Sequence, residues 1–325
     1  MQARAVAHPN IALIKYWGKR DTTLNLPAVG SISITLDQLA AQTRVSFDQA
    51  LDDDELILNG QPQPAALPRI SRCLDACRAL AGTDRRARIT SENNFPTAAG
   101  LASSAAGYAA LVTAASAALD LELDKPALSG LARQGSGSAA RSLFGGFVEW
   151  HRGERDDGSD SLAEALLDGA DWPLEVVIGI TSEEAKSTGS TEGMELSRLT
   201  SPYYAAWLDG QEQDLAAARQ AIQQQDFEQL AELAEFSCLK MHAVAMSSQP
   251  GLIYWNGATV AAMQQVRELR QAGTPVFFTI DAGPQIKAVC EAGASVQVEQ
   301  ALAEVPGVQR TIHCGLGESA RLIED

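Results

Sequence analysis

Residues 96–107, Pro-Thr-Ala-Ala-Gly-Leu-Ala-Ser-Ser-Ala-Ala-Gly, combine very small side chains with two adjacent hydroxyls. Such a loop lets backbone N–H groups approach an anion closely, and the start of a following helix adds unpaired donors and a positive dipole end. The loop matches neither the Walker A nor the GxGxxG pattern. The alternative is a Ser-capped helix whose small residues serve packing. The candidate phosphate-binding residues are Pro96, Ala99, Gly100, Leu101, Ala102, Ser103 and Ser104, and Ser104 is also a candidate magnesium ligand.

A second segment, residues 10–21, places two lysines four positions apart around an aromatic pair. Lys15 and Lys19 are compact cations suited to phosphate oxygens, and Tyr16 and Trp17 offer rigid walls with polar tips. A strand end with solvated lysines is the alternative, because surface lysines are common.

A third segment again has a Gly/Ser turn at a predicted helix start. It covers residues 134–142, Gln-Gly-Ser-Gly-Ser-Ala-Ala-Arg-Ser. Here a basic residue, Arg141, follows three positions after Ser138. Backbone donors, the hydroxyls of Ser136 and Ser138, and the guanidinium fork together suit a carboxylate. A flexible turn beside a surface arginine would have the same composition.

One carboxylate stands where a predicted strand runs into a Gly-rich turn. Asp281 follows Val-Phe-Phe-Thr-Ile and precedes Ala-Gly-Pro. A strand end of this kind can aim an acid into a cleft, where it could orient a hydroxyl or accept its proton. An aspartate that only starts a turn is the alternative.

These motifs resemble the galactokinase–homoserine kinase–mevalonate kinase–phosphomevalonate kinase (GHMP kinase) superfamily, and within it the diphosphomevalonate decarboxylase branch. The Ala-Ala-Gly-Leu-Ala-Ser-Ser form of the loop, the string Asn-Ile-Ala-Leu-Ile-Lys-Tyr-Trp-Gly-Lys and the Thr-Ile-Asp-Ala-Gly-Pro turn are all similar to that branch. The resemblance spans residues 8 to about 287. It implies an α+β, two-lobed fold, with a ribosomal protein S5 domain 2-like N-terminal lobe and a ferredoxin-like α/β C-terminal lobe.

The resemblance also implies roles for individual residues. It places the catalytic residues at Asp281, the essential acid, at Lys15, a charge-stabilising amine, and at Arg141, which also binds the substrate carboxylate. The segment Leu26–Ser31 departs from the Pro-x-Asn-x-Ser form of many members, which leaves one substrate wall undefined. The implied substrate residues are Tyr16, Trp17, Lys19, Ser136, Gly137, Ser138, Arg141, Ser190 and Met194, the last two in a substrate-lining loop, and Ser91 and Asn93 lie near the nucleotide.

The implied reaction is the ATP- and magnesium-dependent decarboxylation of mevalonate 5-diphosphate to isopentenyl diphosphate, with release of ADP, phosphate and CO2. A mevalonate 3-kinase or phosphomevalonate decarboxylase of the same fold is the nearest alternative. A kinase without decarboxylation, such as a homoserine kinase, is more distant. A catalytically dead ligand-binding member is a different class, which intact Lys19, Arg141 and Asp281 argue against.

Composition narrows the remaining possibilities. The 325 residues carry a formal charge of −16, with 25 basic against 41 acidic side chains, so a nucleic-acid partner is not expected. The five cysteines have no zinc spacing and indicate free thiols in a reducing cytoplasm. No signal peptide is expected, and the uncharged stretch 93–119 is too rich in Ala, Gly and Ser for a membrane span. A homodimer is common in the resembling family.

Hydrophobic periodicity predicts strands in the first half of the chain and helices later. We expect lobes at residues 1–185 and 186–325, and an Asn-Gly hairpin turn at residues 59–60. The expected strands cover 6–16, 31–36, 43–47, 88–91, 143–150, 174–180 and 276–280, and the expected helices cover 67–81, 103–119, 125–133, 203–247 and 258–272.

Overall fold

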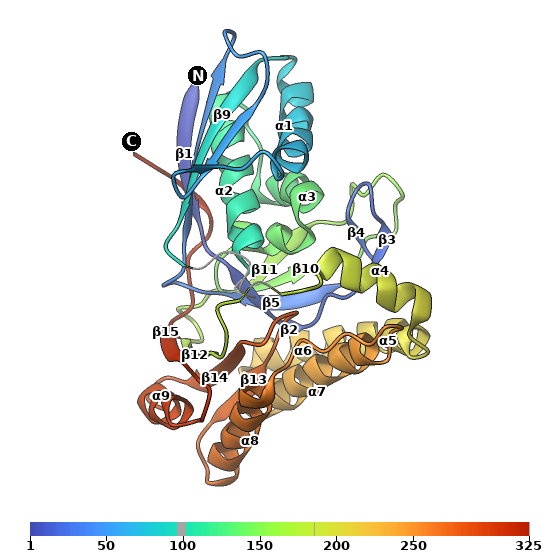
Figure 1. Ribbon diagram of the computed structural model, residues 1–325, viewed down its shortest axis with the longest axis vertical. Coiled ribbons are helices and arrows are strands. Elements are labelled where there is room, and N and C mark those ends of the chain that lie inside the picture. The colour runs from blue at the N-terminus through green and yellow to red at the C-terminus, as the bar shows by residue number, and fades with distance from the viewer. Residues whose placement is uncertain (96–101, 185, 325) are drawn as a thin grey trace.

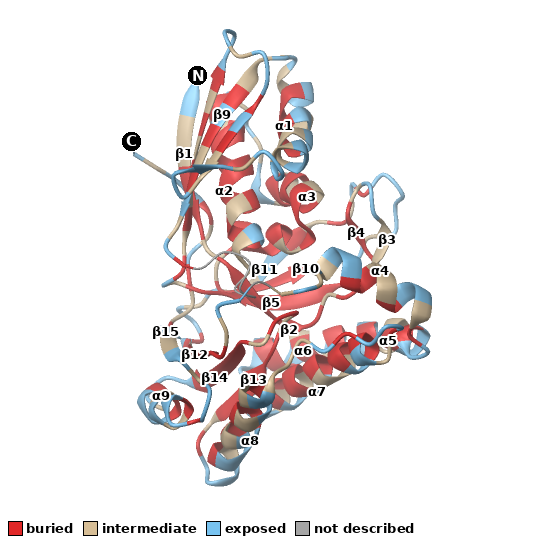
Figure 2. Ribbon diagram, in the orientation of Figure 1, coloured by how far each residue is buried: buried red, intermediate tan, exposed pale blue. Residues whose placement is uncertain are grey.

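The computed structural model describes residues 1–95, 102–184 and 186–324. Three larger β-sheets and their helices build the molecule, with the first sheet at one end and the third at the other (Figure 1). Buried residues follow the sheets and the helix faces that cover them (Figure 2). The predicted mixture of strands and helices is confirmed.

The first sheet has six strands in the order β16-β1-β6-β9-β7-β8. In β6 buried residues alternate with partly exposed ones, as the period-two pattern at 43–47 predicts. The predicted hairpin turn is confirmed, because Asn59 and Gly60 have positive φ values of 49° and 76°. The strands are β1 (Gln2–Ala7), β6 (Ala41–Asp48), β7 (Glu55–Leu58), β8 (Gln61–Pro62), β9 (Arg86–Asn93) and β16 (Arg321–Ile323).

Helices α1 (Leu67–Ala81), α2 (Ser103–Ala118) and α3 (Lys125–Gly135) accompany this sheet (Figure 1). Helix α2 is buried on almost all sides, and its small side chains let it pack directly on β1 and β6. Cys73 and Cys77 are buried on α1, and all five cysteines are free thiols, as predicted. None of the described helices combines the length and apolar character that a membrane-spanning segment requires.

A second sheet, β11-β10-β5-β2, forms the middle of the molecule (Figure 1). The expected strand at 143–150 is wrong over its first half, because residues 137–143 form a 3-10 helix, η1, and Gly146 turns the chain with φ 64° before β10 begins. The strands are β2 (Asn10–Ile14), β5 (Ser31–Thr35), β10 (Phe147–Trp150) and β11 (Ala163–Leu167), and a short pair, β3 (Lys19–Asp21) and β4 (Leu26–Pro27), lies beside them.

The third sheet, β13-β14-β12-β15, carries the later helices. The expected helix at 203–247 is wrong as one element, because the chain breaks at Gly210 and at Gln225, which adopts φ 53°. Leu215 and Ile222 therefore lie on a different helix from Leu230. The elements are β12 (Leu174–Ile180), β13 (Val276–Thr279), β14 (Ile286–Glu291), β15 (Arg310–Cys314), α4 (Ser190–Thr200), α5 (Tyr204–Asp209), α6 (Gln211–Gln224), α7 (Phe227–Met246), α8 (Gly257–Gln271) and α9 (Ser295–Ala303).

Strands from the two halves of the chain pair with each other in the first and third sheets. The C-terminal strand β16 pairs with β1, and β12 pairs with β14 and β15 of the third sheet. Helix α7 packs on both β13 and β2 (Figure 1). The lobe division at residues 185 and 186 stays a prediction.

Candidate functional site

A cavity of about 710 Å³ lies where the three sheets approach one another. Every described residue predicted to bind substrate, bind nucleotide or take part in catalysis lines it, whereas Pro96, Ala99, Gly100 and Leu101 lie outside the described residues. The predicted residues that line the cavity are Lys15, Tyr16, Trp17, Lys19, Ser91, Asn93, Ala102, Ser103, Ser104, Ser136, Gly137, Ser138, Arg141, Ser190, Met194 and Asp281.

Asp281 follows β13 and is the one carboxylate among the described residues that line the cavity. Its Oδ1 accepts a hydrogen bond from Lys15 Nζ at 2.7 Å, and Lys287 Nζ lies 3.4 Å from Oδ2. Burial alone would raise the pKa of Asp281, but the two ammonium groups outweigh it and hold this pKa well below its usual range. The side chain keeps 26% of its surface exposed, so an ionised carboxylate faces the cavity.

Lys15 comes directly after β2 and is almost fully buried. Its ammonium is held by two acceptors, Asp281 Oδ1 and the carbonyl oxygen of Ala12 at 2.8 Å. A cation fixed in this way, with one face toward the cavity, can stabilise negative charge that develops on a ligand.

Helix α2 points its N-terminus at the cavity. No described side chain caps it, and Ala102 enters the helix in a left-handed conformation with φ 54°. Ser104 Oγ lies 3.3 Å from Ser136 Oγ, which links the α2 start to the turn before η1. Free N–H groups at a helix start, with hydroxyls beside them, are suited to bind an anion. Ser91 and Asn93, on β9, line the same cavity.

Arg141 is a buried cation that no described carboxylate pairs with. Its Nε donates to Asn10 Oδ1 at 3.1 Å, and its Nη1 donates to the hydroxyl of Ser31. Burial lowers the pKa of Arg141 to about 10, so the guanidinium stays charged at neutral pH. A buried charge without an acidic partner among the residues that the structure describes fits an anionic ligand in the cavity.

Tyr16 and Trp17, the aromatic pair predicted at the substrate wall, are held by different contacts. Trp17 is buried and donates from Nε1 to Ser197 Oγ at 3.0 Å, whereas Tyr16 packs edge-on against Trp150 with ring centroids 4.9 Å apart. Lys19 donates to Asn25 Oδ1 at 2.5 Å. Burial, and then the charge of Arg69, lower the pKa of Lys19 to about 8.

Ser190 and Met194 line the cavity, but the expectation that they form a loop is wrong. They open helix α4, where Gly189 precedes the first turn and Ser190 accepts a hydrogen bond from Lys186 Nζ at 2.8 Å. Met194 also packs in the cluster around Trp17, so it fills the core and lines the cavity at once.

Sequence reasoning missed three further cations at this site. Lys186 and Arg69 line the cavity, and Lys287 forms the second ion pair of Asp281. Only Lys287 has a signal in the sequence, since a lysine inside the apolar run Ile-Lys-Ala-Val-Cys needs a buried partner. The apolar part of the cavity wall was missed as well, and it is formed by Leu56, Leu58, Ile70, Ile89, Tyr108 and Leu111.

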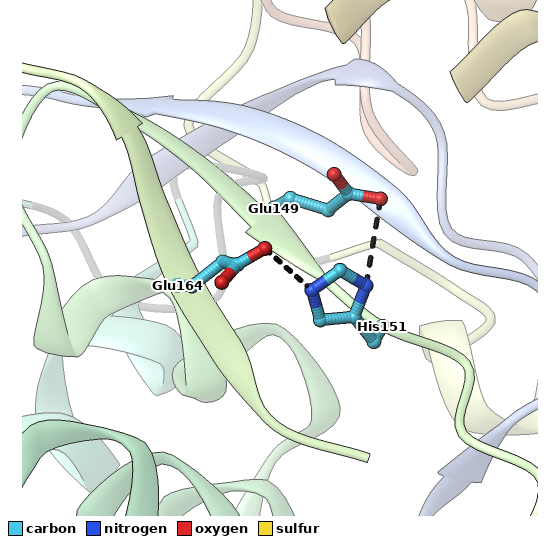
Figure 3. A group of neighbouring side chains, drawn as sticks. All are labelled: Glu149, His151 and Glu164. Carbon is cyan, nitrogen blue, oxygen red and sulfur yellow. Dashed lines mark hydrogen bonds and ion pairs between the residues drawn. The ribbon is translucent and has the colours of Figure 1, made fainter. Parts of the chain in front are cut away.

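A separate charged cluster lies on β10 and β11 (Figure 3). Glu149 and Glu164 are directly opposite each other in the sheet, where like charges destabilise. His151 lies between them, with Nε2 2.8 Å from Glu164 and Nδ1 3.7 Å from Glu149, and Arg219 donates to Glu149 at 2.8 Å. Arg219 therefore gives the cluster a counter-charge within the fold, and none of these residues lines the cavity.

Comparison with known proteins matches both halves of the chain. Residues 7–163 match the family model described as diphosphomevalonate decarboxylase-like N-terminal domain, and residues 176–317 match the mevalonate 5-diphosphate decarboxylase C-terminal domain. The diphosphomevalonate decarboxylase mvd1 of Aspergillus fumigatus is 43% identical over 303 residues, 87% of this chain and 75% of the fungal protein. The human diphosphomevalonate decarboxylase is 40% identical over 299 residues, 85% of this chain and 73% of the human protein.

Solved structures give the same result. The mevalonate diphosphate decarboxylase of Staphylococcus aureus has a TM-score of 0.94 and 41% identity, covering 99% of this chain and 98% of that one. A structure described as MDDEF in complex with MVAPP, AMPPCP and magnesium has a TM-score of 0.93 and 38% identity, covering 100% and 99%. These likenesses confirm the predicted two-lobed GHMP kinase fold. With both domain models matched along the chain, the protein belongs to the diphosphomevalonate decarboxylase family.

Proposed function

We propose that the cavity carries out the ATP-dependent decarboxylation of mevalonate 5-diphosphate to isopentenyl diphosphate, with release of ADP, phosphate and CO2. One observation carries this proposal. An ionised carboxylate, Asp281, faces the same cavity as the start of α2 and the guanidinium of Arg141, and no described side chain caps that start or forms an ion pair with that guanidinium. The acid, a triphosphate site and a carboxylate site are parts that this reaction requires, together with a site for the diphosphate of the substrate.

The substrate has two anionic ends, and the cavity offers a cationic group for each. Arg141, with the Ser136–Ser138 turn, would bind the carboxylate, because a guanidinium fork and hydroxyl donors match its oxygens. Lys19, beside Tyr16 and Trp17, would bind the diphosphate, together with Arg69 or Lys186. The substrate would thus be held at both ends with its tertiary hydroxyl between them.

The nucleotide would lie along β9 and the start of α2. Backbone donors of α2 with Ser103 and Ser104 suit the phosphates, and Ser91 and Asn93 suit the adjoining part of the molecule. The apolar wall between α1 and β7 would take the base. Magnesium, when bound, neutralises charge on the β- and γ-phosphates, and the Ser104 hydroxyl is a ligand type that this ion accepts.

Asp281 would orient the C3 hydroxyl for attack on the γ-phosphorus. The new O–P bond forms as the bond to ADP breaks, and the hydroxyl proton passes to Asp281 late in this step. The C3–O bond then breaks, phosphate leaves, and the electron pair of the C–CO2 bond forms the alkene. Because two lysines hold the pKa of Asp281 below its usual range, orienting the hydroxyl fits this group better than accepting its proton early.

Lys15 would stabilise charge on the transferring phosphoryl group. Its ammonium lies 2.7 Å from Asp281, so an oxygen held by the acid would also lie near this cation. Positioning and electrostatics would supply most of the acceleration, as in other phosphoryl transfers. A homodimer and a cytoplasmic location stay predictions.

A direct assay tests this function. Purified protein is mixed with MgATP and, in turn, with mevalonate, its 5-phosphate and its 5-diphosphate, and ADP and CO2 are measured. We expect equal amounts of ADP and CO2 with the diphosphate and much lower rates with the other two. ADP without CO2 would indicate a kinase, and preference for the monophosphate would indicate a phosphomevalonate decarboxylase.

A further inference from the structure

We infer that Cys238 and His242, one turn apart on α7, are positioning residues that hold the backbone at Ile280 and thereby aim the Asp281 carboxylate. This inference rests on the role proposed above for Asp281. It concerns side chains that do not line the cavity and that no motif in the sequence singles out.

Ile280 lies where the chain leaves its sheet. The pairing of β13 with β14 ends at Thr279, which lies opposite Lys287, so the sheet ladder does not extend to the next residue. Ile280 is fully buried, and its N–H and C=O groups need partners inside the protein. The partners come from α7, and they fix the peptide unit that leads directly into Asp281.

Hydrogen bonds from α7 hold both the N–H and the C=O group of Ile280. Its N–H donates to Cys238 Sγ at 3.3 Å, and its carbonyl oxygen accepts from the same thiol at 3.5 Å. His242 Nε2 lies 3.2 Å from that carbonyl oxygen, and its ring packs on Trp255 with centroids 4.5 Å apart. Because a carbonyl oxygen only accepts, His242 must present Nε2 as the N–H donor.

Both side chains stay uncharged despite the ions around them. Burial, followed by the charge of Lys15, lowers the pKa of His242 to about 3, and burial raises the pKa of Cys238 to about 11. Lys15, Lys287 and Asp281 are the charged groups that act on both. A neutral donor can hold a backbone oxygen next to Asp281 without competing with the lysines for the carboxylate.

Helix α7 also binds the backbone of Lys15, the ion-pair partner of Asp281. Ser237 Oγ accepts the backbone N–H of Lys15 at 2.9 Å, and Glu235 lies 3.4 Å from the backbone N–H of Phe278. Lys15 and Asp281 are 266 residues apart in the chain, yet one helix binds the backbone beside each. A single rigid element therefore sets the distance between the acid and its cation.

Substitutions at His242 test the inference. His242→Leu removes the donor while filling the space, and His242→Gln places an amide N–H where Nε2 lies. We expect His242→Leu to lower kcat about tenfold to a hundredfold, with KM for ATP within about twofold, because a small misplacement of a reacting group has effects of this size. We expect His242→Gln to recover most of the loss.

A matched control and a double variant separate positioning from loss of stability. Leu269→Ala removes an apolar side chain from the same buried cluster and should lower Tm without lowering kcat. In an Asp281→Asn background, His242→Leu should reduce the residual turnover no further, whereas a purely structural defect would reduce it by the same factor as before. If His242→Leu does not fold, Cys238→Ala, with Cys238→Ser as its conservative partner, gives the same comparison.

The outcomes are distinct. Near-normal turnover of Asp281→Asn would overturn the proposed role of the acid itself. An inactive Asp281→Asn together with full kcat in His242→Leu and Cys238→Ala would overturn only the positioning role of α7. A loss of kcat that matches the Leu269→Ala control at equal Tm would overturn it as well.

Discussion

Two ion pairs in this molecule have the same chemistry but different surroundings: one is enclosed in the fold, and the other faces the cavity. In the first lobe, Arg78 and Asp54 are 4% and 1% exposed, and the backbone N–H of Ala87 also donates to Asp54. Arg78 makes further bonds to the carbonyl of Arg85 and to Asp75. At the cavity, Lys15 is equally buried, but Asp281 is 26% exposed. The first pair is closed within the fold, and the second is open on one side.

The difference shows what an open pair can do. A closed pair satisfies the charges it has buried, so removing one partner leaves an uncompensated charge and costs stability. An open pair keeps an ionised oxygen available to a ligand, and its lysines keep that oxygen ionised. Variants of the closed pair should therefore have a lower free energy of unfolding and an unchanged kcat. Variants of the open pair should lose kcat before they lose stability.

The largest effect is expected at the open pair. Asp281→Asn keeps the size of the side chain but removes the charge, and we expect kcat to fall about 10²–10⁴-fold. ATP binding should stay within about twofold, since the nucleotide phosphates would bind at α2. Steady-state kinetics and nucleotide titration measure the two effects. Near-normal turnover in this variant would remove Asp281 from the chemistry.

Arg78→Met is the matching change at the closed pair. It leaves the buried carboxylate of Asp54 without its cation, and we expect a loss of about 3–5 kcal/mol in the free energy of unfolding. Urea unfolding measures this loss, and kcat at a temperature well below unfolding should be unchanged. A reduced kcat with full stability would contradict the assignment of this pair to the fold alone.

The pKa of Lys19 predicts how substrate binding at the cavity depends on pH, a dependence that the closed pair should not have. Its pKa of about 8 means that the free enzyme loses this cation above that pH. We expect kcat/KM for mevalonate 5-diphosphate to fall about tenfold per pH unit above about pH 8. Lys19→Arg should flatten this limb, because a guanidinium stays charged. The same pH profile in both proteins would show that another group titrates.

The smallest effect concerns acid stability. The lowered pKa of Asp281 means that its pair stabilises the fold above the unfolded-state pKa of about 4 and loses this contribution as pH falls toward the folded-state value. We expect the Tm advantage of the wild type over Asp281→Asn to shrink as pH is lowered below about 4. Thermal melts at several pH values measure it, and a growing advantage would contradict the sign.

Local chemistry alone predicted a large part of this protein. The small-residue helix at 103–118, the strand at 174–180 and the Asn59–Gly60 turn follow from side-chain size, periodicity and backbone preference within a few residues. The cavity-lining positions of Lys15, Arg141 and Asp281 also agree with the sequence, because Lys15 and Arg141 lie in motifs suited to anions and Asp281 stands where a strand runs into a Gly-rich turn. Such features depend on neighbours in the chain, so the sequence alone determined them.

Tertiary structure decided which charges meet. The apolar run around Lys287 indicates a buried partner but does not show that this partner is Asp281. Nothing in the sequence indicates that Lys15 holds the other oxygen of Asp281, or that Cys238 and His242 bind the peptide before it. The break at Gln225 and the helical start of Ser190 were likewise not visible in periodicity. Distances between segments far apart in sequence depend on how sheets and helices pack, and no local pattern contains that information.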